Sequence, residues 1–247
     1  MMNEIKIHSK VNVNLHPDSL RGGDSQGVKT ARLALGVLYV AEGKVRDLYS
    51  IVKGKALVQQ KAIMMAMPKP AEGKAKVAPA LMYDQQAADH VISVGTPLAT
   101  AALKTADVAI TSLTETVSQL DSAINIKLLA GKSNRGEELR SWAAKQELPF
   151  QKLGELFQAA HKNAALVSAV LEGESYLSNL SVENRNLLRT VAAGVMAPDE
   201  VTARKETFDA LEHLTTAAKS FGASMGEVFN SLASPEIGAI NSIVKEG

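Results

Sequence analysis

The triplet Gly131-Lys132-Ser133 is the part of this sequence that comes nearest to a nucleotide-binding motif. A Walker loop places its first glycine five residues before the second, but that position here is Ile126. The loop also follows a strand, whereas the pattern before Gly131 is helical. The sequence therefore predicts no phosphate-binding loop.

The sequence also lacks the residue patterns that are typical of metal sites and catalytic nucleophiles. The five histidines, at 8, 16, 90, 161 and 213, never form a His-Glu-x-x-His pair, and there is no cysteine. Asp84, Asp89 and His90 share one predicted helix, but a single helical turn is a weak basis for a metal site. No Gly-x-Ser-x-Gly elbow or Rossmann glycine pattern occurs. We expect no enzyme, catalytic residue, cofactor or metal.

Charge divides the chain unevenly, although the net charge is only +1. Residues 1–80 hold 13 basic and 6 acidic side chains, a balance of +7, and the remainder holds 14 basic and 20 acidic ones. Such asymmetry can favour nucleic acid, anionic lipid or an acidic partner. Without clustered arginines or interleaved aromatic residues, solvated helix faces explain it more simply.

The N-terminus alternates between apolar and polar residues, which predicts a half-buried β-strand. No later segment alternates as cleanly, so the strand has no evident partner within the chain. We expect it to pair with another chain, or alternatively to fray or lie on the helices. The apolar positions of this strand arm are Ile5, Ile7, Val11, Val13 and Leu15.

Two helices and a linker are expected between residues 28 and 131. Apolar spacing predicts one helix over 28–67, and the prolines and lysines of 68–79 predict a linker. A short helix should follow from Ala80 to Val94, and Thr96-Pro97 should start a long one. Met64, Met65 and Met67 at the end of the first helix are either an adaptable binding face or core.

A heptad pattern of apolar residues runs along the long helix. Its partner is either the helix of residues 28–67, packed antiparallel within the chain, or the same helix of a neighbouring subunit. Together with Ala106, the seam consists of Leu103, Ile110, Leu113, Val117, Leu120 and Ile124.

The segment from 132 to 247 is predicted to be a bundle of shorter helices. Gly173 should stop one helix, Ser181 should cap the next, and Pro198 should open a longer one. Two short helices should follow, around residues 225–232 and 237–244.

The predicted fold is mainly α: a long helical hairpin with a coiled-coil-like helix, a C-terminal bundle and a short N-terminal strand arm. The expected divisions are 1–27 for the arm and loop, 28–131 for the long helices and 132–247 for the bundle. No apolar stretch approaches the roughly 20 residues of a spanning helix, and the first residues lack the pattern of a secretory signal.

Motifs in the second half resemble a helical module of uncharacterised proteins from tailed bacteriophages and prophages. They lie within residues 136–220 and include Glu137-Glu138-Leu139-Arg140, Ala169-Val170-Leu171-Glu172-Gly173 and Ala197-Pro198-Asp199-Glu200. The resemblance implies a phage context. Together with the unpaired strand and the long seam, it predicts a non-enzymatic structural or assembly protein that forms oligomers or binds virion components, located in the virion or host-cell cytoplasm. The alternative is a virulence protein exported without a classical signal peptide, which contacts a host membrane or protein.

Overall fold

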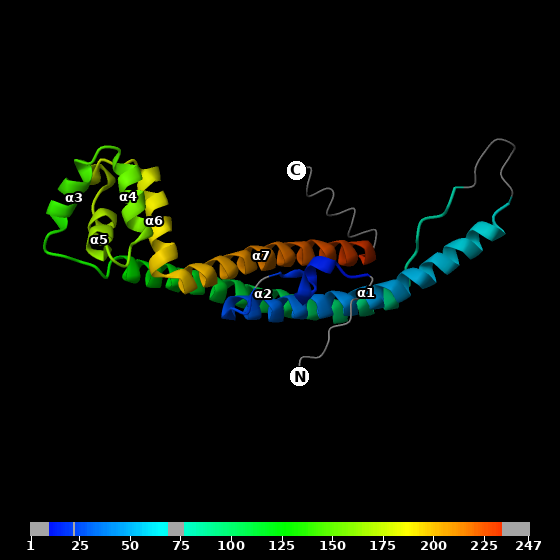
Figure 1. Ribbon diagram of the computed structural model, residues 1–247. Coiled ribbons are helices and arrows are strands. Elements are labelled where there is room, and N and C mark those ends of the chain that lie inside the picture. Colours follow the sequence, from blue (N-terminus) through cyan, green and yellow to red (C-terminus); the bar gives the residue numbers. More distant parts are fainter. Residues whose placement is uncertain (1–9, 22, 69–76, 234–247) are drawn as a thin grey trace, which may run out of the picture. The chain divides into compact units, whose positions relative to one another are not determined.

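The computed structural model describes residues 10–21, 23–68 and 77–233, and within these ranges the regular structure is helical. The short 3₁₀ helices are η1 (Val13–Leu15), η2 (Pro17–Ser19) and η3 (Ser175–Ser178). The α-helices are α1 (Gln26–Ala66), α2 (Gln85–Leu128), α3 (Gly136–Ala144), α4 (Pro149–Gln158), α5 (Ala164–Glu172), α6 (Val182–Met196) and α7 (Pro198–Leu232). The mainly α prediction is confirmed (Figure 1).

Two compact units divide the chain. The first comprises residues 1–22, 29–111 and 211–247, and the second comprises 23–28 and 112–210. The helices α1, α2 and α7 each have residues in both units. The expected boundary at 131 falls inside the second unit.

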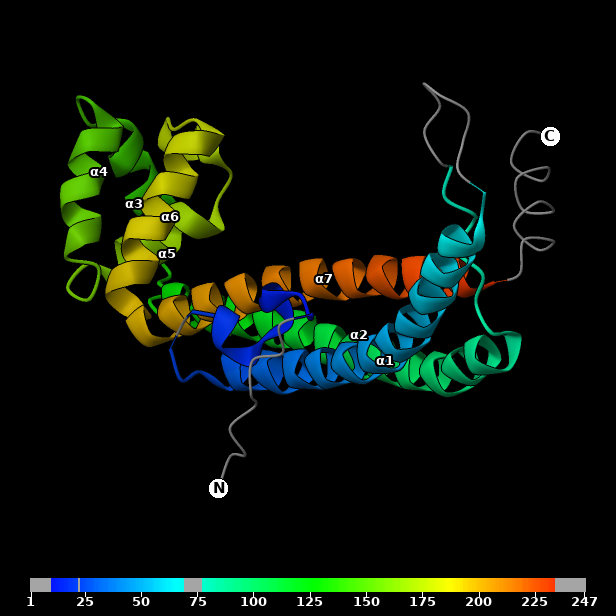
Figure 2. The ribbon, with the colours of Figure 1, turned by 90° about the vertical axis from the view of Figure 1, so that its right-hand side faces the viewer.

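Three helices lie side by side in the first unit: α1, residues 85–111 of α2 and residues 211–232 of α7 (Figures 1 and 2). A Cβ added to Gly95 of α2 would lie 2.8 Å from Phe229 of α7 and 3.3 Å from Val45 of α1. All three helices therefore meet at this level. Because Gly95 has no side chain, α2 can approach its two neighbours closely.

Small residues form the buried face of α2 in this unit. The heptad seam predicted from the larger residues lies beside that face. Leu113 and Ile124 are buried, while Leu103, Ile110, Val117 and Leu120 are half-buried. The most buried row consists of Ala88, Val91, Ala99, Ala102, Ala106 and Ala109.

The predicted N-terminal strand is wrong for the residues that the structure describes. A strand would place Val11, Val13 and Leu15 on one face. Instead Val11 and Leu15 are buried while Val13 is 65% exposed. The Asn12 side chain accepts a hydrogen bond from the Asn14 amide at 3.0 Å and caps η1, and Pro17 opens η2. Asparagine and proline turn the backbone here, and Ile5 and Ile7 lie outside the described residues.

These N-terminal turns pack on the chain's own helices. The Asn12 amide donates to Ser220 at 3.0 Å, and Ser19 lies 2.9 Å from His213 Nε2. The rings of His16 and Tyr39 meet edge to face with centroids 5.0 Å apart. The segment thus contacts both α1 and α7, as in the alternative in which it lies on the helices.

The prediction that a long helix starts at Thr96-Pro97 is also wrong. Asp84 caps α2, with its carboxylate accepting from the Ala87 amide at 2.9 Å, and the helix continues through Pro97. Pro97 is exposed, so its ring displaces no core side chain. Similarly, α7 continues through the predicted break near residue 220 to Leu232, and the expected helix at 237–244 lies outside the described residues.

The second unit has its own apolar core. Its members include Leu153 and Phe157 of α4, Val167 and Val170 of α5, and Leu188 of α6. As predicted, Gly173 ends α5, Ser181 caps α6 by accepting from the Asn184 amide, and Pro198 opens α7.

Ion pairs join α2 to the first turns of α7 in this second unit. Arg204 donates to Asp121 at 2.5 and 3.2 Å, and Lys127 Nζ lies 2.6 Å from Glu200. The hydrogen bond from Lys127, together with the amide at the start of α7, lowers the pKa of the Glu200 carboxyl. The carboxylate is therefore retained to lower pH than an ordinary glutamate.

Substituting alanine for each of two glycines in the second unit should change the free energy of unfolding in opposite directions. A Cβ at Gly131 would lie 2.3 Å from the Ala164 carbonyl, and this backbone cannot move aside easily. We expect Gly131→Ala to lower the free energy of unfolding by about 2 kcal/mol. Nothing lies within 4 Å of a Cβ at Gly154 of α4, so Gly154→Ala should raise it by about 0.5–1 kcal/mol. Urea denaturation measures both, and equal effects of the two substitutions would contradict this packing.

Candidate protein-binding surface

A buried ionic network fixes α1 against α7 in the first unit. Glu42 is fully buried, and its Oε1 accepts from Arg46 Nε at 2.7 Å and from Ser224 Oγ at 2.7 Å. Arg46 Nη2 also donates to Ser224 at 2.5 Å. No described residue donates to Glu42 Oε2. Because a buried carboxylate is costly without partners, this network holds the two helices at one register.

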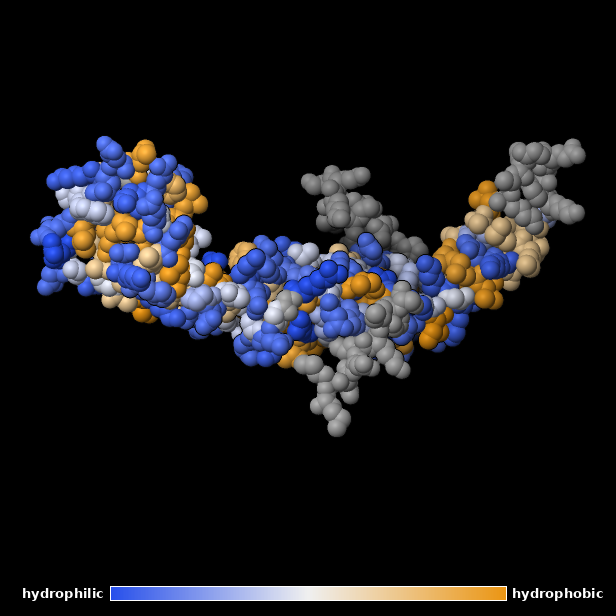
Figure 3. Space-filling view, viewed as in Figure 1, coloured by the Kyte–Doolittle hydropathy of each residue, from blue (hydrophilic) through white to orange (hydrophobic). Residues whose placement is uncertain are grey.

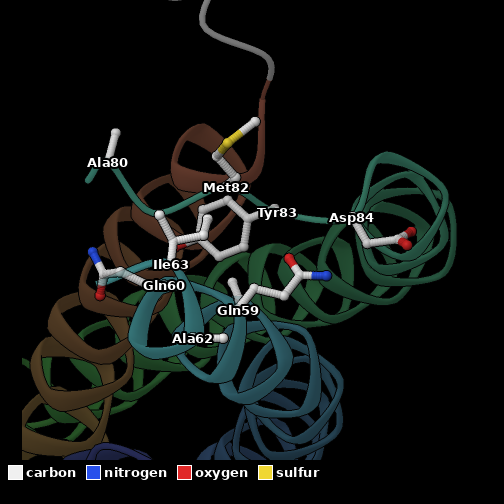
Figure 4. Close-up of a pocket in the computed structure, with 9 residues that line it drawn as sticks. Gln59, Gln60, Ala62, Ile63, Ala80, Met82, Tyr83 and Asp84 are labelled. Atoms are coloured by element: carbon white, nitrogen blue, oxygen red, sulfur yellow. The ribbon is translucent and has the colours of Figure 1, made fainter. Parts of the chain in front are cut away.

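The end of α1 carries a cavity of about 380 Å³ against the segment that precedes α2. Gln59, Gln60 and Ile63 come from α1, and Met82 and Tyr83 come from the segment (Figure 4). Gln60 Nε2 donates to the Pro79 carbonyl at 2.6 Å and holds the segment against the helix. Ala56, Ala62, Ala80 and Asp84 complete the lining.

Exposed apolar side chains lie on the last turns of α1 and on the segment before α2. Met65 and Val77 are each 83% exposed, Met82 is 69% exposed and Ile63 is 43% exposed. Figure 3 shows this apolar area at the end of α1. We call these four residues and the cavity lining the α1-end surface. Of the three methionines predicted as either binding face or core, Met65 is exposed while Met64 and Met67 are half-buried.

Two tyrosines form a hydrogen-bonded pair beside the α1-end surface. Tyr49 of α1 bonds to Tyr83 and to Ser231 of α7, and Lys53 Nζ lies 5.7 Å from the centre of its ring. Burial acts to raise the pKa of Tyr49, but the two hydrogen bonds and the charges of Lys53 and Arg46 together lower it. Burial and the bond from Tyr49 raise the pKa of Tyr83 to about 12.

The residues that the sequence offered for phosphate or metal binding make structural contacts. Lys132 pairs with Glu172 at 2.9 Å, and the Ser133 hydroxyl accepts from the Arg135 amide. Asp84 caps α2, and Asp89 accepts from Gln85 at 2.8 Å. Over residues 10–21, 23–68 and 77–233, no three histidine or carboxylate groups lie close enough to hold a metal ion. None of the helices in those ranges is long and apolar enough to cross a membrane.

The sequence did not reveal the Glu42 network or the tyrosine pair. Glu42 and Arg46 stand four residues apart within an apolar helix face, which is a signal for an ion pair. Nothing in the sequence connects Tyr49 with Tyr83 or Ser231.

Comparisons with family models, curated proteins and solved structures found no match to this chain. The likeness to phage helical modules therefore rests on the sequence motifs alone.

Removing the cation from the buried network should destabilise the protein strongly. In Arg46→Met the apolar stem remains, but Glu42 keeps a buried carboxyl without its cation. We expect the free energy of unfolding to fall by about 3 kcal/mol, measured by urea denaturation. Lys55→Met, at an exposed position on the same helix, should change it by less than about 0.5 kcal/mol. A loss as small as that of the control would contradict the role of the network.

The tyrosine pair should appear in a spectroscopic pH titration. Tyr49 should deprotonate below the ordinary value of 10, and Tyr49→Phe should remove this first step. Tyr83→Phe removes one bond that lowers the pKa of Tyr49, so the step should move to higher pH. Since the pKa of Tyr83 is raised to about 12, its contribution to stability is complete below pH 10 and is lost as pH rises toward 12. If all tyrosines titrate together near 10, the pair does not form.

Proposed function

We propose that this chain is a non-enzymatic structural or assembly protein that acts by docking on other protein chains. The observation that supports it best is the α1-end surface, where Ile63 and Met82 are exposed at an apolar cavity and Met65 and Val77 are exposed on the adjoining stretches of chain. Side chains of this kind are costly to leave in water and are typical of interaction sites. Methionine is flexible enough to adapt to a partner's shape.

A bacteriophage setting is the context that we propose for this docking. Its support is the resemblance of residues 136–220 to phage helical modules. The helical framework fits the role, because α1 is anchored to α7 by the Glu42 network and so presents its end on a rigid support.

Particle association tests this proposal. When the genome that encodes the chain is induced to produce phage, the wild-type protein should band with purified particles. Met65→Glu/Met82→Glu places charges on the α1-end surface and should reduce the amount in particles at least tenfold. Thr105→Glu, at an exposed polar position on α2, is the matched control and should leave the amount unchanged. Absence of the wild-type chain from the particles would refute the proposed setting.

One observation favours a second candidate, an exported protein that contacts a host membrane. Lys53, Lys55 and Lys61 are exposed on α1 near the apolar α1-end surface, a combination that suits anionic lipid interfaces. Flotation with vesicles of phosphatidylcholine and phosphatidylserine tests it. Binding that the Met65→Glu/Met82→Glu variant loses would favour this candidate, and no flotation would exclude it.

A further inference from the structure

The side of α1 away from the helical core is exposed over eight successive heptad positions. They follow spacings of 4, 3, 4, 3, 4, 3 and 4 residues, and every one is exposed. Five are apolar, with exposed fractions of 69% for Leu33 and Val58 and 58% for Ile51. We call these positions the outer stripe: Leu33, Val37, Val40, Lys44, Asp47, Ile51, Gly54 and Val58.

This spacing is that of a coiled-coil seam. The inner side of α1 already packs in the chain, with Leu35, Leu38 and Val45 buried. The outer stripe is therefore a second seam on the same helix. A continuous row of exposed aliphatic residues is typical of a surface that a partner buries in the assembled protein.

The charges in the middle of the outer stripe indicate which partner is complementary to it. When two copies of α1 lie antiparallel about a two-fold axis, residues whose numbers add up to 91 face each other. Lys44 then faces Asp47 of the second copy, and the same pair forms again across the axis. Opposite charges meet at the centre, and the symmetry makes every contact occur twice.

The same register matches the apolar positions. Val40 faces Ile51, Leu33 faces Val58, and Val37 faces Gly54, where nothing of its own chain lies within 4 Å of a Cβ position. A parallel pair would instead bring Lys44 against Lys44 and Asp47 against Asp47. Like charges at the centre of a seam disfavour that arrangement.

We infer that the outer stripe is an antiparallel interface with a second copy of this chain. The inference deepens the proposed function by naming one partner, and it rests on that proposal only in taking exposed apolar faces as docking surfaces. Asp47 also contacts Lys10 at 3.8 Å, in a pair whose side chains are both half exposed or more.

Cysteine cross-linking tests the register directly, because the chain has no cysteine of its own. Val40→Cys and Ile51→Cys chains, mixed and oxidised mildly, should form a disulfide-linked dimer. Each variant alone should not, since residues 40 and 40 of the two copies would be about 16 Å apart at 1.5 Å per residue. Thr111→Cys mixed with Ser122→Cys, at exposed positions eleven residues apart on α2, is the control and should stay unlinked.

Charge exchange then tests the centre of the seam in the same assay. Lys44→Asp in both chains should reduce cross-linking at least tenfold, and Lys44→Asp/Asp47→Lys should restore it. Circular dichroism checks that each variant remains helical.

Several outcomes would overturn the inference. The first is that Val40→Cys and Ile51→Cys chains cross-link no faster than the α2 control pair. The second is that Val40→Cys chains cross-link with one another. The third is that Lys44→Asp does not change the rate of cross-linking. If residues 1–9 of the same chain covered the outer stripe, the Val40→Cys and Ile51→Cys chains would not cross-link, and deleting residues 1–9 would allow them to do so. All steps use the purified protein, so failure here leaves binding to virion components through the α1-end surface untouched.

Discussion

The arrangement of the first unit depends on one buried carboxylate. Glu42 lies on the inner side of α1, where the neighbouring turns bear leucine and valine, and its Oε1 accepts hydrogen bonds from Arg46 and Ser224. An isolated charge in such a place would be prohibitive, so α7 must bring Ser224 to this level of α1. Apolar packing alone would tolerate a helix slipping by one turn. The network does not, and it thereby determines which side of α1 faces the core.

The outward surfaces follow from that orientation. With Leu35, Leu38 and Val45 committed to the core, the heptad row from Leu33 to Val58 is left on the opposite side. The alanine-rich face of α2 and the glycine at 95 allow close approach, so few large side chains are needed inside. A second set of large apolar residues of α1, including Leu33, Ile51 and Met65, remains exposed, which is the property expected of a helix that docks on other chains.

Helical periodicity and punctuation predicted much of this fold. The first long helix, the end of α5 at Gly173, the cap of α6 at Ser181 and the start of α7 at Pro198 all depend on local chemistry, which a sequence displays. The errors arose where local signals conflict with packing. Alternation at residues 11–15 came from turns that bury Val11 and Leu15, and Pro97 lies on an exposed side of a helix that its neighbours hold together.

The candidate surface was only partly visible in the sequence. The sequence draws attention to the methionines near residue 65, but the cavity is lined by Ile63 of α1 together with Met82 and Tyr83, which follow a linker that gives no indication of its path. The outer stripe was hidden because the inner and outer rows of α1 have the same heptad spacing. Only the exposed fractions separate the two rows. The sequence period shows that a helix has apolar rows, but only the packing of the folded chain shows which row stays exposed to a partner.

Sedimentation velocity of the unmodified protein, over about a hundredfold range of concentration, tests the central claim that α1 is a docking helix. The account predicts a mass that rises with concentration from the 26.2 kDa of one chain toward twice that value. A mass that stays at 26.2 kDa up to the highest concentration would contradict it.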